Sequence, residues 1–333
     1  MKRASIKDIA EKAGVSIALV SYVLNDKFVN RINKETAKKI KEIAAELNYK
    51  PNKIAQSLKS NKTNTIALLV ADIANPFTSQ VARIIEDETS KRGYMLLIGS
   101  SDENEEKLKQ LIDLFQKRQV DGFIIAPVEN SESIINNLVE TKAPVVLIDR
   151  PIDNMEIDSI VTNNFEISYQ AVNYLINKGK KNIAIFSYKK NLENLKNRVE
   201  GYKKALKDSK IYLDSEKIIY IEESKTQSEV YKAIDELNLM TTDALFFTSN
   251  KLAIAALKKL STLDIKIPEE LALVTFDESE AFDIFRVPLT HIKQPIKKIS
   301  KKAVELLIEK IENTNLLQQQ IVYNSEIIIG KSV

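Results

Sequence analysis

The chain has 333 residues, 44% of them hydrophobic, with no cysteine and a single histidine, His291. This length accommodates one small domain and one or two larger α/β units, and the lack of thiols excludes disulfides, thiolate zinc sites and cysteine nucleophiles. One histidine leaves little for general-base chemistry at neutral pH, so we expect no enzyme, no catalytic residues, no metal and no cofactor. Without an apolar run of about 18 residues or a signal peptide, we expect a cytoplasmic protein that makes no membrane contact.

The net charge of +3 is unevenly distributed along the chain. Residues 1–62 contain 14 Lys and Arg against 6 Asp and Glu, whereas the remainder contains 35 against 40. A basic head on a mildly acidic body is the charge pattern of a nucleic-acid-binding module fused to another domain. A basic surface that only contacts solvent gives the same count, so charge alone leaves both interpretations open.

The head is predicted to be helical, with helices over 6–13, 16–25, 34–47 and 52–58. Gly14 permits the tight turn from the first helix into the second. In the second helix Val20 and Val23 turn inward, which leaves four side chains on the outer face: Ile17, Ala18, Ser21 and Tyr22. A recognition helix presents such a face to base edges in the major groove. An ordinary three-helix bundle has the same spacing and remains the alternative.

From residue 65 onward, apolar runs alternate with amphipathic segments, as in βαβ units with parallel sheets. Strands are predicted at 66–71, 95–99, 122–126, 145–148, 183–186, 218–221, 244–247 and 272–276. Helices are predicted at 77–91, 105–118, 167–178, 198–209, 252–260 and 295–311. The short stretch 158–162 divides the strands into two sets, so we expect two Rossmann-like halves. Ligands of such sheets bind beyond the carboxyl ends of the strands.

Sequence motifs over nearly the whole chain resemble the LacI/GalR family of repressors. In the head these are IKDIAEKAGVSIALVSYVLN, RINKETAKKIKEIAAELNYKPN and IAQSL; in the body they are IANPF, KRGYMLLIGSSDEN, VDGFIIAP, VVLIDR, RVEGYKKAL and VTFDE. The resemblance implies an all-α helix-turn-helix head and an α/β body like a periplasmic binding protein, with two Rossmann-like subdomains. It implies a DNA-binding transcriptional regulator, most often a repressor, controlled by a small molecule bound between the subdomains.

The family also implies which residues contact DNA. Phosphate contacts are expected from Ser5, Ser16, Asn25, Arg31, Asn33, Thr36 and Asn52, and base contacts from Ile17, Ala18 and Tyr22 beside Ser21. Ala55 and Leu58 occupy the hinge-helix positions that enter the minor groove in relatives, where an apolar wedge unstacks a base step. Most relatives have arginine in place of Tyr22, so the operator sequence cannot be transferred from them.

Effector contacts implied by the resemblance come from both subdomains: Asn75, Phe77, Arg150, Asn163, Arg198, Phe246, Asn250 and Asp277. Relatives usually have aspartate in place of Asn163 and an Asn-Asp pair where this chain has Ser249 and Asn250. With Lys251 nearby, these changes predict a less acidic pocket and an anionic effector, such as a sugar acid or sugar phosphate held by arginine. A neutral sugar remains open.

The expected domains are a helix-turn-helix at 1–50, a hinge helix and linker at 51–64, and an effector-binding and dimerisation domain at 65–333. Within the last, one subdomain covers about 65–161 and 292–319, and the other about 162–291 and 320–333. The expected partners are double-stranded operator DNA at the nucleoid, a carbohydrate-derived effector and a second copy of the chain. A regulator that has no effector or answers to a protein partner, and a sugar-binding protein without regulatory role, are the alternatives.

Overall fold

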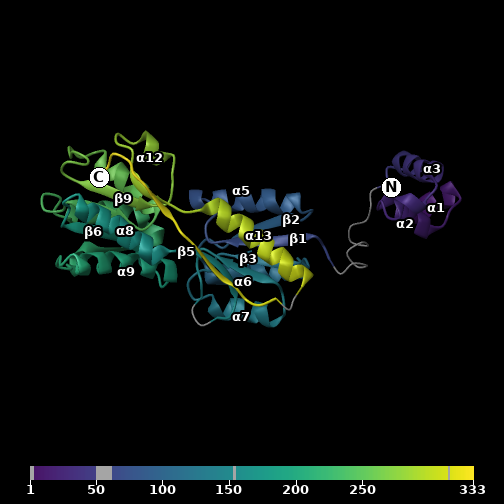
Figure 1. Ribbon diagram of the computed structural model, residues 1–333, viewed down its shortest axis with the longest axis horizontal. Coiled ribbons are helices and arrows are strands. Elements are labelled where there is room, and N and C mark those ends of the chain that lie inside the picture. Colours follow the sequence, from purple (N-terminus) through teal and green to yellow (C-terminus); the bar gives the residue numbers. More distant parts are fainter. Residues whose placement is uncertain (1–3, 50–61, 153–154, 314–315) are drawn as a thin grey trace. The chain divides into compact units, whose positions relative to one another are not determined.

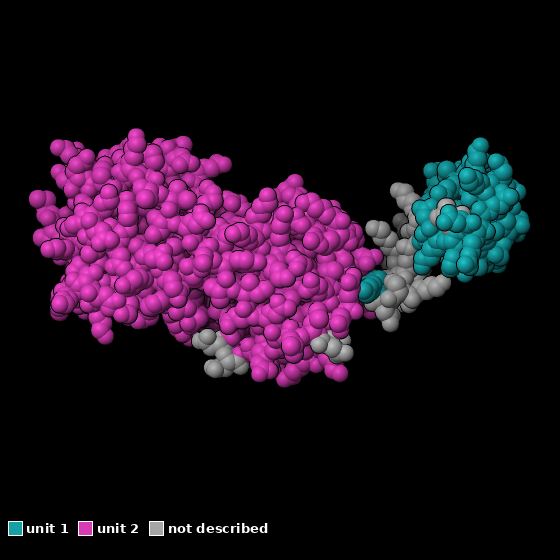
Figure 2. All heavy atoms as spheres, viewed as in Figure 1, with its two compact units in different colours: residues 1–63 teal, residues 64–333 magenta. Residues whose placement is uncertain are grey.

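The computed structural model describes residues 4–49, 62–152, 155–313 and 316–333. The chain divides into two compact units, Met1–Thr63 and Asn64–Val333, coloured separately in Figure 2. The expected hinge positions Asn52, Ala55 and Leu58 lie outside the described residues. No described helix is both long and apolar enough to cross a bilayer.

Within residues 4–49, the head contains three α-helices and one 3-10 turn: α1 (Ile6–Ala13), α2 (Ile17–Leu24), η1 (Val29–Arg31) and α3 (Lys34–Glu46). Gly14 ends α1 in the left-handed conformation, at φ 70°, which is the turn predicted from the sequence. The helices enclose a small apolar core in which Ile9, Val20 and Ile40 are fully buried. The head therefore has the expected helix-turn-helix arrangement.

The first half of the body is built on a six-stranded sheet of described residues, in the order β11-β5-β4-β3-β1-β2. Its strands are β1 (Thr65–Val70), β2 (Met95–Ser100), β3 (Gly122–Ile125), β4 (Val145–Ile148), β5 (Asp158–Thr162) and β11 (Gln320–Tyr323). Helices α5 (Pro76–Lys91) and α13 (Ile296–Glu312) pack on one face, and α6 (Glu105–Lys117) and α7 (Glu132–Glu140) pack on the other. All pairings in this sheet are parallel.

The second half repeats this plan with six described strands in the order β12-β10-β9-β8-β6-β7. They are β6 (Ile183–Tyr188), β7 (Ile218–Ile221), β8 (Ala244–Phe247), β9 (Ala272–Phe276), β10 (Thr290–Lys293) and β12 (Glu326–Ile328). The accompanying helices are α8 (Asn164–Asn177), α9 (Glu193–Asp208), α10 (Thr226–Glu236), α11 (Asn250–Leu260) and the short α12 (Ala281–Ile284), with 3-10 turns η2 (Ser215–Lys217) and η3 (Glu223–Lys225).

Helices α8 and α9 cover one face of the second sheet, and α10 and α11 cover the other. Gly201 lets α9 lie close to α8, because a Cβ there would come within 2.4 Å of the Phe165 carbonyl oxygen. The two sheets with their helices lie side by side in Figure 1. The predicted fold class is confirmed in both the head and the body.

The chain passes between the two halves three times, and the third crossing differs from the predicted position. Strand β10 remains in the second sheet through Lys293, and the second crossing follows it directly. Strand β11 pairs with β5 in the first sheet, so the third crossing comes after Tyr323 and not near Gln320. The last segment, yellow in Figure 1, then runs across to form β12, which is antiparallel to β10.

Helix α9 begins earlier than predicted. It starts at Glu193 rather than at Arg198, which places Arg198 in the second turn instead of at the exposed helix start. As a result, Arg198 is 3% exposed and belongs to the interior of the second half.

Candidate DNA-binding surface and effector cleft

Three of the predicted phosphate-contacting side chains serve as helix caps in the head. The Ser5 hydroxyl accepts a hydrogen bond from the Asp8 backbone N–H at 3.3 Å, and Asp8 reciprocates by accepting the Ser5 N–H at 2.7 Å. Ser16 caps α2 through the Leu19 N–H at 3.2 Å, and Asn33 caps α3 through the Glu35 N–H at 2.8 Å. These residues lie at helix N-termini, whose backbone N–H groups and dipoles favour phosphate.

The remaining predicted phosphate contacts lie close to the same elements. Asn25 follows α2 and donates its side-chain amide to the Ser21 carbonyl at 2.7 Å. Arg31 ends η1 and is exposed, and Thr36 is half-buried in the first turn of α3.

The outer face of α2 carries the predicted base-reading residues. Ile17 is 48% exposed and Tyr22 is 39% exposed, while Val20 and Val23 face the core. Ala18 is exposed beside Ile17, and Ser21 is half-buried. Exposed apolar side chains on one face of a helix are candidates for contact with a partner. This face is thus the candidate surface for reading DNA bases.

An aromatic pair, missed in the sequence, stands at the end of this face. The rings of Tyr22 and Phe28 meet edge to face, with centroids 4.9 Å apart and an interplanar angle of 79°. Phe28 is 54% exposed and has a positive φ of 55°, which is uncommon for a bulky residue. A strained, exposed aromatic that contacts Tyr22, one of the predicted base-reading residues, is a further candidate for this surface.

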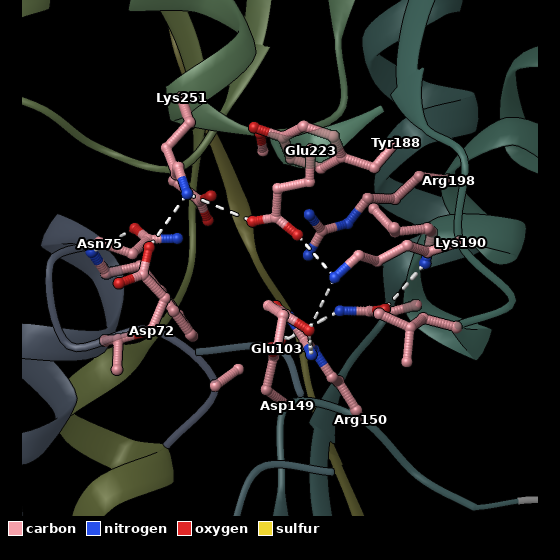
Figure 3. Close-up of a pocket in the computed structure, with 18 of the residues that line it drawn as sticks. Asp72, Asn75, Glu103, Asp149, Arg150, Tyr188, Lys190, Arg198, Glu223 and Lys251 are labelled. Atoms are coloured by element: carbon pink, nitrogen blue, oxygen red, sulfur yellow. Dashed lines mark hydrogen bonds and ion pairs between the residues drawn. The ribbon is translucent and has the colours of Figure 1, made fainter. Parts of the chain in front are cut away.

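In the body, a cleft forms where strands of both halves end. Asp72 and Asn75 follow β1, Glu103 follows β2 and Arg150 follows β4, all in the first half. From the second half, Lys190 follows β6, Glu223 follows β7, Lys251 follows β8 and Asp277 follows β9. This is the edge at which open α/β sheets bind ligands. Figure 3 labels all of these side chains except Asp277 and shows the labelled ones converging from the two halves.

Of the eight predicted effector contacts, five line the cleft: Asn75, Phe77, Arg150, Arg198 and Asp277. The other three are used within the fold. Phe246 is fully buried and packs against Phe276, with ring centroids 6.1 Å apart. Asn250 is also fully buried and donates to the Asn75 Oδ1 at 3.2 Å. Asn163 accepts the Ser325 N–H at 2.8 Å and so joins two of the crossing segments.

The side chains of the cleft form one continuous series of ion pairs, which we call the ion-pair chain: Asp72, Lys251, Glu223, Lys190, Glu103 and Arg150. The Lys251 Nζ lies 2.9 Å from Asp72 and 3.2 Å from Glu223. The Lys190 Nζ lies 2.6 Å from Glu223 and 3.1 Å from Glu103. Figure 3 shows that two of these contacts, Lys251 to Asp72 and Lys190 to Glu103, connect opposite halves.

Arg150 is held by a carboxylate of its own half. Its two terminal nitrogens bind the two Glu103 oxygens at 2.6 and 2.9 Å in a bidentate pair. Burial alone would raise the pKa of the Glu103 carboxyl, but the charges and hydrogen bonds of Arg150 and Lys190 lower this pKa to about 2. Burial likewise opposes the charge of Lys251, yet its hydrogen bond to Asp72 and the charge of Glu223 raise the pKa of this ammonium.

Charges of the two signs are nearly balanced in the cleft. Its lining contains five carboxylates, of Asp72, Glu103, Asp149, Glu223 and Asp277, and four cations, of Arg150, Lys190, Arg198 and Lys251. Asp72, Glu103 and Glu223, which follow strands far apart in the sequence, were not among the predicted effector contacts. The cavity that remains among these side chains is only ≈ 50 Å³, whereas ligand pockets usually measure about 300–1,000 Å³.

Arg198 and Asp277 occupy the buried side of the cleft. Arg198 donates to the Asn164 Oδ1 at 2.8 Å and to the Thr248 carbonyl at 2.7 Å, and its guanidinium carbon lies 3.8 Å from the Phe276 ring centroid. Burial raises the pKa of the Asp277 carboxyl, which accepts a hydrogen bond from the Gln294 Nε2 at 2.7 Å.

Two aspartates have the same unusual backbone conformation in the two halves. Asp149 directly follows β4 with φ 65°, and Asp277 directly follows β9 with φ 68°. Gln294, at the second crossing, links Asp277 to Thr162 at the first crossing, because the Thr162 hydroxyl donates to its Oε1 at 3.1 Å. Asp149 was missed in the sequence, although LIDR and TFDE share an apolar strand followed by aspartate.

The chain matches two protein-family profiles. Residues 63–326 match the periplasmic binding proteins and sugar binding domain of the LacI family, and residues 5–52 match the bacterial regulatory proteins of the lacI family. The chain belongs to the LacI family. The second match contains the candidate DNA-binding surface of the head, and the first contains the residues that line the cleft.

Relatives of similar length are transcriptional regulators. The chain is 31% identical to the HTH-type transcriptional repressor PurR of Aliivibrio fischeri (strain MJ11), over 99% of this chain and 98% of the relative. It is 32% identical to the HTH-type transcriptional regulator RegA of Clostridium saccharobutylicum, over 98% of each. The LacI-family chain is thus a transcriptional regulator with DNA-binding and effector-binding domains, and not an enzyme.

The fold is that of the lac repressor. A solved structure of the lac repressor dimer bound to operator and the anti-inducer ONPF aligns with a TM-score of 0.86 at 21% identity, over 99% of each chain. A complex of the transcriptional regulator CelR with cellobiose aligns with a TM-score of 0.74 at 22% identity, over 99% of this chain and 100% of that one.

Proposed function

We propose that the chain is a repressor that binds a pseudo-palindromic operator as a homodimer and releases or tightens its hold when a small molecule enters the cleft. The exposed face of α2, with Ile17, Ala18 and Tyr22, supports base reading in the major groove. The capped helix ends at Ser5, Ser16 and Asn33 support phosphate contacts, as do Asn25, Arg31 and Thr36. We extend the proposal to Asn52, Ala55 and Leu58 from the family resemblance alone. Such a regulator acts on the nucleoid in the cytoplasm.

We propose a carbohydrate-derived effector: a sugar, a sugar acid or a sugar phosphate. The supporting observation is that the strand ends of both halves bring Asn75, Phe77, Arg150, Arg198 and Asp277 to one cleft. An aromatic ring beside amide, guanidinium and carboxylate groups suits a polyol, whose ring faces stack while its hydroxyls form hydrogen bonds. We propose that Asn163, Phe246 and Asn250 support the cleft from behind.

Binding is coupled to DNA through the three crossings between the halves. Ligand contacts on both sides of the cleft change the relative populations of its open and closed forms, and the paired first halves transmit this change to the two heads. Gln294 lies at this junction, because it contacts both Asp277 in the cleft and Thr162 at the first crossing.

The test combines operator selection with ligand screening. Operators are selected from random DNA, and their binding is then measured with and without sugars, sugar acids and sugar phosphates. A ligand at about 100 times its Kd should add about 2.7 kcal/mol to the free energy of unfolding. Arg198→Ala should abolish the response to that ligand and leave operator binding by the free protein intact. A chain that selects no operator would refute the proposal.

A second candidate is a regulator without a small-molecule effector, or one that answers to a protein. It is favoured by the small cavity of ≈ 50 Å³, which the ion-pair chain largely fills. Selection of an operator whose binding no carbohydrate-derived compound changes, together with an unaltered unfolding temperature throughout the screen, would favour this candidate.

A further inference from the structure

The two lysines of the ion-pair chain each contact one carboxylate from their own half and one from the opposite half. Glu223 is the shared partner within the second half, at 2.6 Å from Lys190 and 3.2 Å from Lys251. The partners from the first half are Glu103 and Asp72. Lys190, Glu223 and Lys251, here called the lysine triad, thus present two ammonium groups for one carboxylate on the second-half wall of the cleft (Figure 3).

We propose that the lysine triad is an anion-binding subsite for the effector, and that Glu103 and Asp72 occupy it in the ligand-free chain. This inference rests on the proposed function, because it assigns a ligand chemistry to the same cleft. The effector then carries at least one carboxylate or phosphate group. That group replaces the two first-half carboxylates at Lys190 and Lys251.

The first-half carboxylates are suited to replacement because each has another partner on its own side. Glu103 retains both hydrogen bonds to Arg150 when Lys190 leaves. Asp72 retains the Ala74 N–H at 2.9 Å, and its side chain is 24% exposed, so water can solvate it. Opening the cleft therefore leaves neither acid as an isolated buried charge, which would be strongly destabilising.

The lysine triad is likewise stable without its first-half partners. Glu223 continues to hold both ammonium groups, and the triad has one excess positive charge. Lys190 is 14% exposed and Lys251 is 31% exposed, so an incoming anion meets partly desolvated cations, where charge-assisted hydrogen bonds are strongest. Of the two arginines expected from the sequence to hold an anion, Arg150 is engaged by Glu103, and Arg198 donates to Asn164 and to the Thr248 carbonyl.

The occupation of the lysine triad by Glu103 and Asp72 also explains the small cavity. With Glu103 and Asp72 bound to the triad, the two walls are drawn together and ≈ 50 Å³ remains. An effector that supplies the anion itself releases both first-half carboxylates and gains the space they leave. A neutral ligand would have to separate these ion pairs without replacing them, so the cleft discriminates in favour of anions.

The test uses the full chain and inorganic phosphate as the probe, with binding measured by isothermal titration calorimetry at low salt. Asp72→Asn removes the carboxylate that occupies Lys251, so phosphate should bind about tenfold tighter than to the parent, the effect of about one charge-assisted hydrogen bond. Adding Lys251→Gln to Asp72→Asn should abolish this gain. Glu103→Gln provides a second test at Lys190. Because this change also releases Arg150, a gain counts for the lysine triad only when adding Lys190→Gln removes it.

Asp235→Asn is the matched control. Asp235 forms an ion pair with Lys259, whose Nζ lies 2.6 Å from the Asp235 Oδ1. Lys259 is on α11, as is Lys251, but it does not line the cleft. Asp235→Asn should leave phosphate affinity unchanged, and thermal unfolding verifies that each variant is folded. A gain equal to that of the control, or one that persists without Lys251, would overturn the inference.

The outcome is independent of DNA binding. A chain that selects an operator but shows no phosphate gain in Asp72→Asn or Glu103→Gln contradicts only the anion subsite. A chain that selects no operator contradicts the proposed function, whatever the calorimetry gives.

Discussion

The head and the cleft display their polar and charged side chains in opposite ways. On the head, Tyr22 and Ile17 project into solvent, and the side chains of Ser5 and Ser16 cap their own helices. In the cleft, by contrast, Glu103, Arg150 and Lys190 are largely buried and bind one another. A partner can therefore contact these head side chains without displacing other groups, whereas a ligand in the cleft has to replace contacts that already exist.

The largest expected difference between these regions is in their response to salt. Exposed charges are screened at physiological ionic strength, whereas buried pairs are screened much less. For a dimer that makes about 6–10 phosphate contacts, operator affinity should fall by about 10³–10⁵ between 50 and 200 mM salt. Fluorescence anisotropy with the selected operator measures this, and a fall below about tenfold would contradict phosphate binding by the basic head.

Acid should affect the cleft through Glu103. Its pKa in the folded chain is about 2, below the ordinary value of 4.5, so its ionised form stabilises the fold above pH 4.5. That contribution is lost as the pH falls from 4.5 to about 2, and it is on the order of 3 kcal/mol. Glu103→Gln should lower stability at pH 7 and remove this part of the acid dependence.

Denaturant unfolding between pH 2 and 7 measures the effect of Glu103→Gln. The surface pair of Lys293 with Glu278 supplies the control, because its side chains are 47% and 41% exposed. Glu278→Gln should change stability by less than about 1 kcal/mol. Equal losses in the two variants would mean that the buried pair is no stronger than an exposed one.

A change in base preference is expected for Tyr22→Arg. Arginine forms a bidentate contact with guanine worth about 1–3 kcal/mol of discrimination, whereas a phenol offers one hydroxyl and a ring face that suits a thymine methyl. The variant should therefore select guanine at one position in each half-site. Parallel operator selection with both proteins is the measurement, and identical consensus sequences would remove Tyr22 from the base-reading surface.

The smallest expected effect concerns Phe28, whose ring contacts Tyr22 edge to face. Phe28→Ala removes an aromatic pair worth about 0.5–1.5 kcal/mol and frees the Tyr22 ring. Preference at the base that Tyr22 contacts should weaken, while phosphate binding and its salt dependence stay the same. Phe28→Tyr keeps the ring and should select the same operator as the parent. If Phe28→Ala also selects the parent's consensus sequence, the aromatic pair has no role in base recognition.

The sequence predicted β1 to β4 and β6 to β9 because their apolar runs are bounded by polar residues, as in β1 and β9. It missed β5 and β10, which are buried but mix polar with apolar residues, and it missed β11 and β12, which are short and only partly buried. This also explains the misplaced third crossing. Strand β11 lies at the edge of its sheet, where pairing with β5 positions it, and its own sequence has no clear hydrophobic pattern.

The cleft was predicted only where the family resemblance supplied a motif. Asn75 and Arg198 were found in this way, but the resemblance also selected Phe246, which is core. Glu103 and Glu223 were missed because a glutamate after a strand looks like any surface acid until its partner is known. Their partner is Lys190, and the three meet only when β2, β6 and β7 are assembled in two different sheets.

The left-handed aspartates at the ends of β4 and β9 let backbone geometry and side-chain chemistry be separated at a single position. Glycine adopts the φ of 68° at Asp277 freely, whereas alanine there meets a cost of about 1 kcal/mol. Asp277→Gly and Asp277→Ala both delete the carboxylate, so any defect they share reports on the chemistry of that group. The difference in the free energy of unfolding between the two variants then measures the backbone strain at position 277. The same pair of substitutions at Asp149 measures the strain at the corresponding position in the other half.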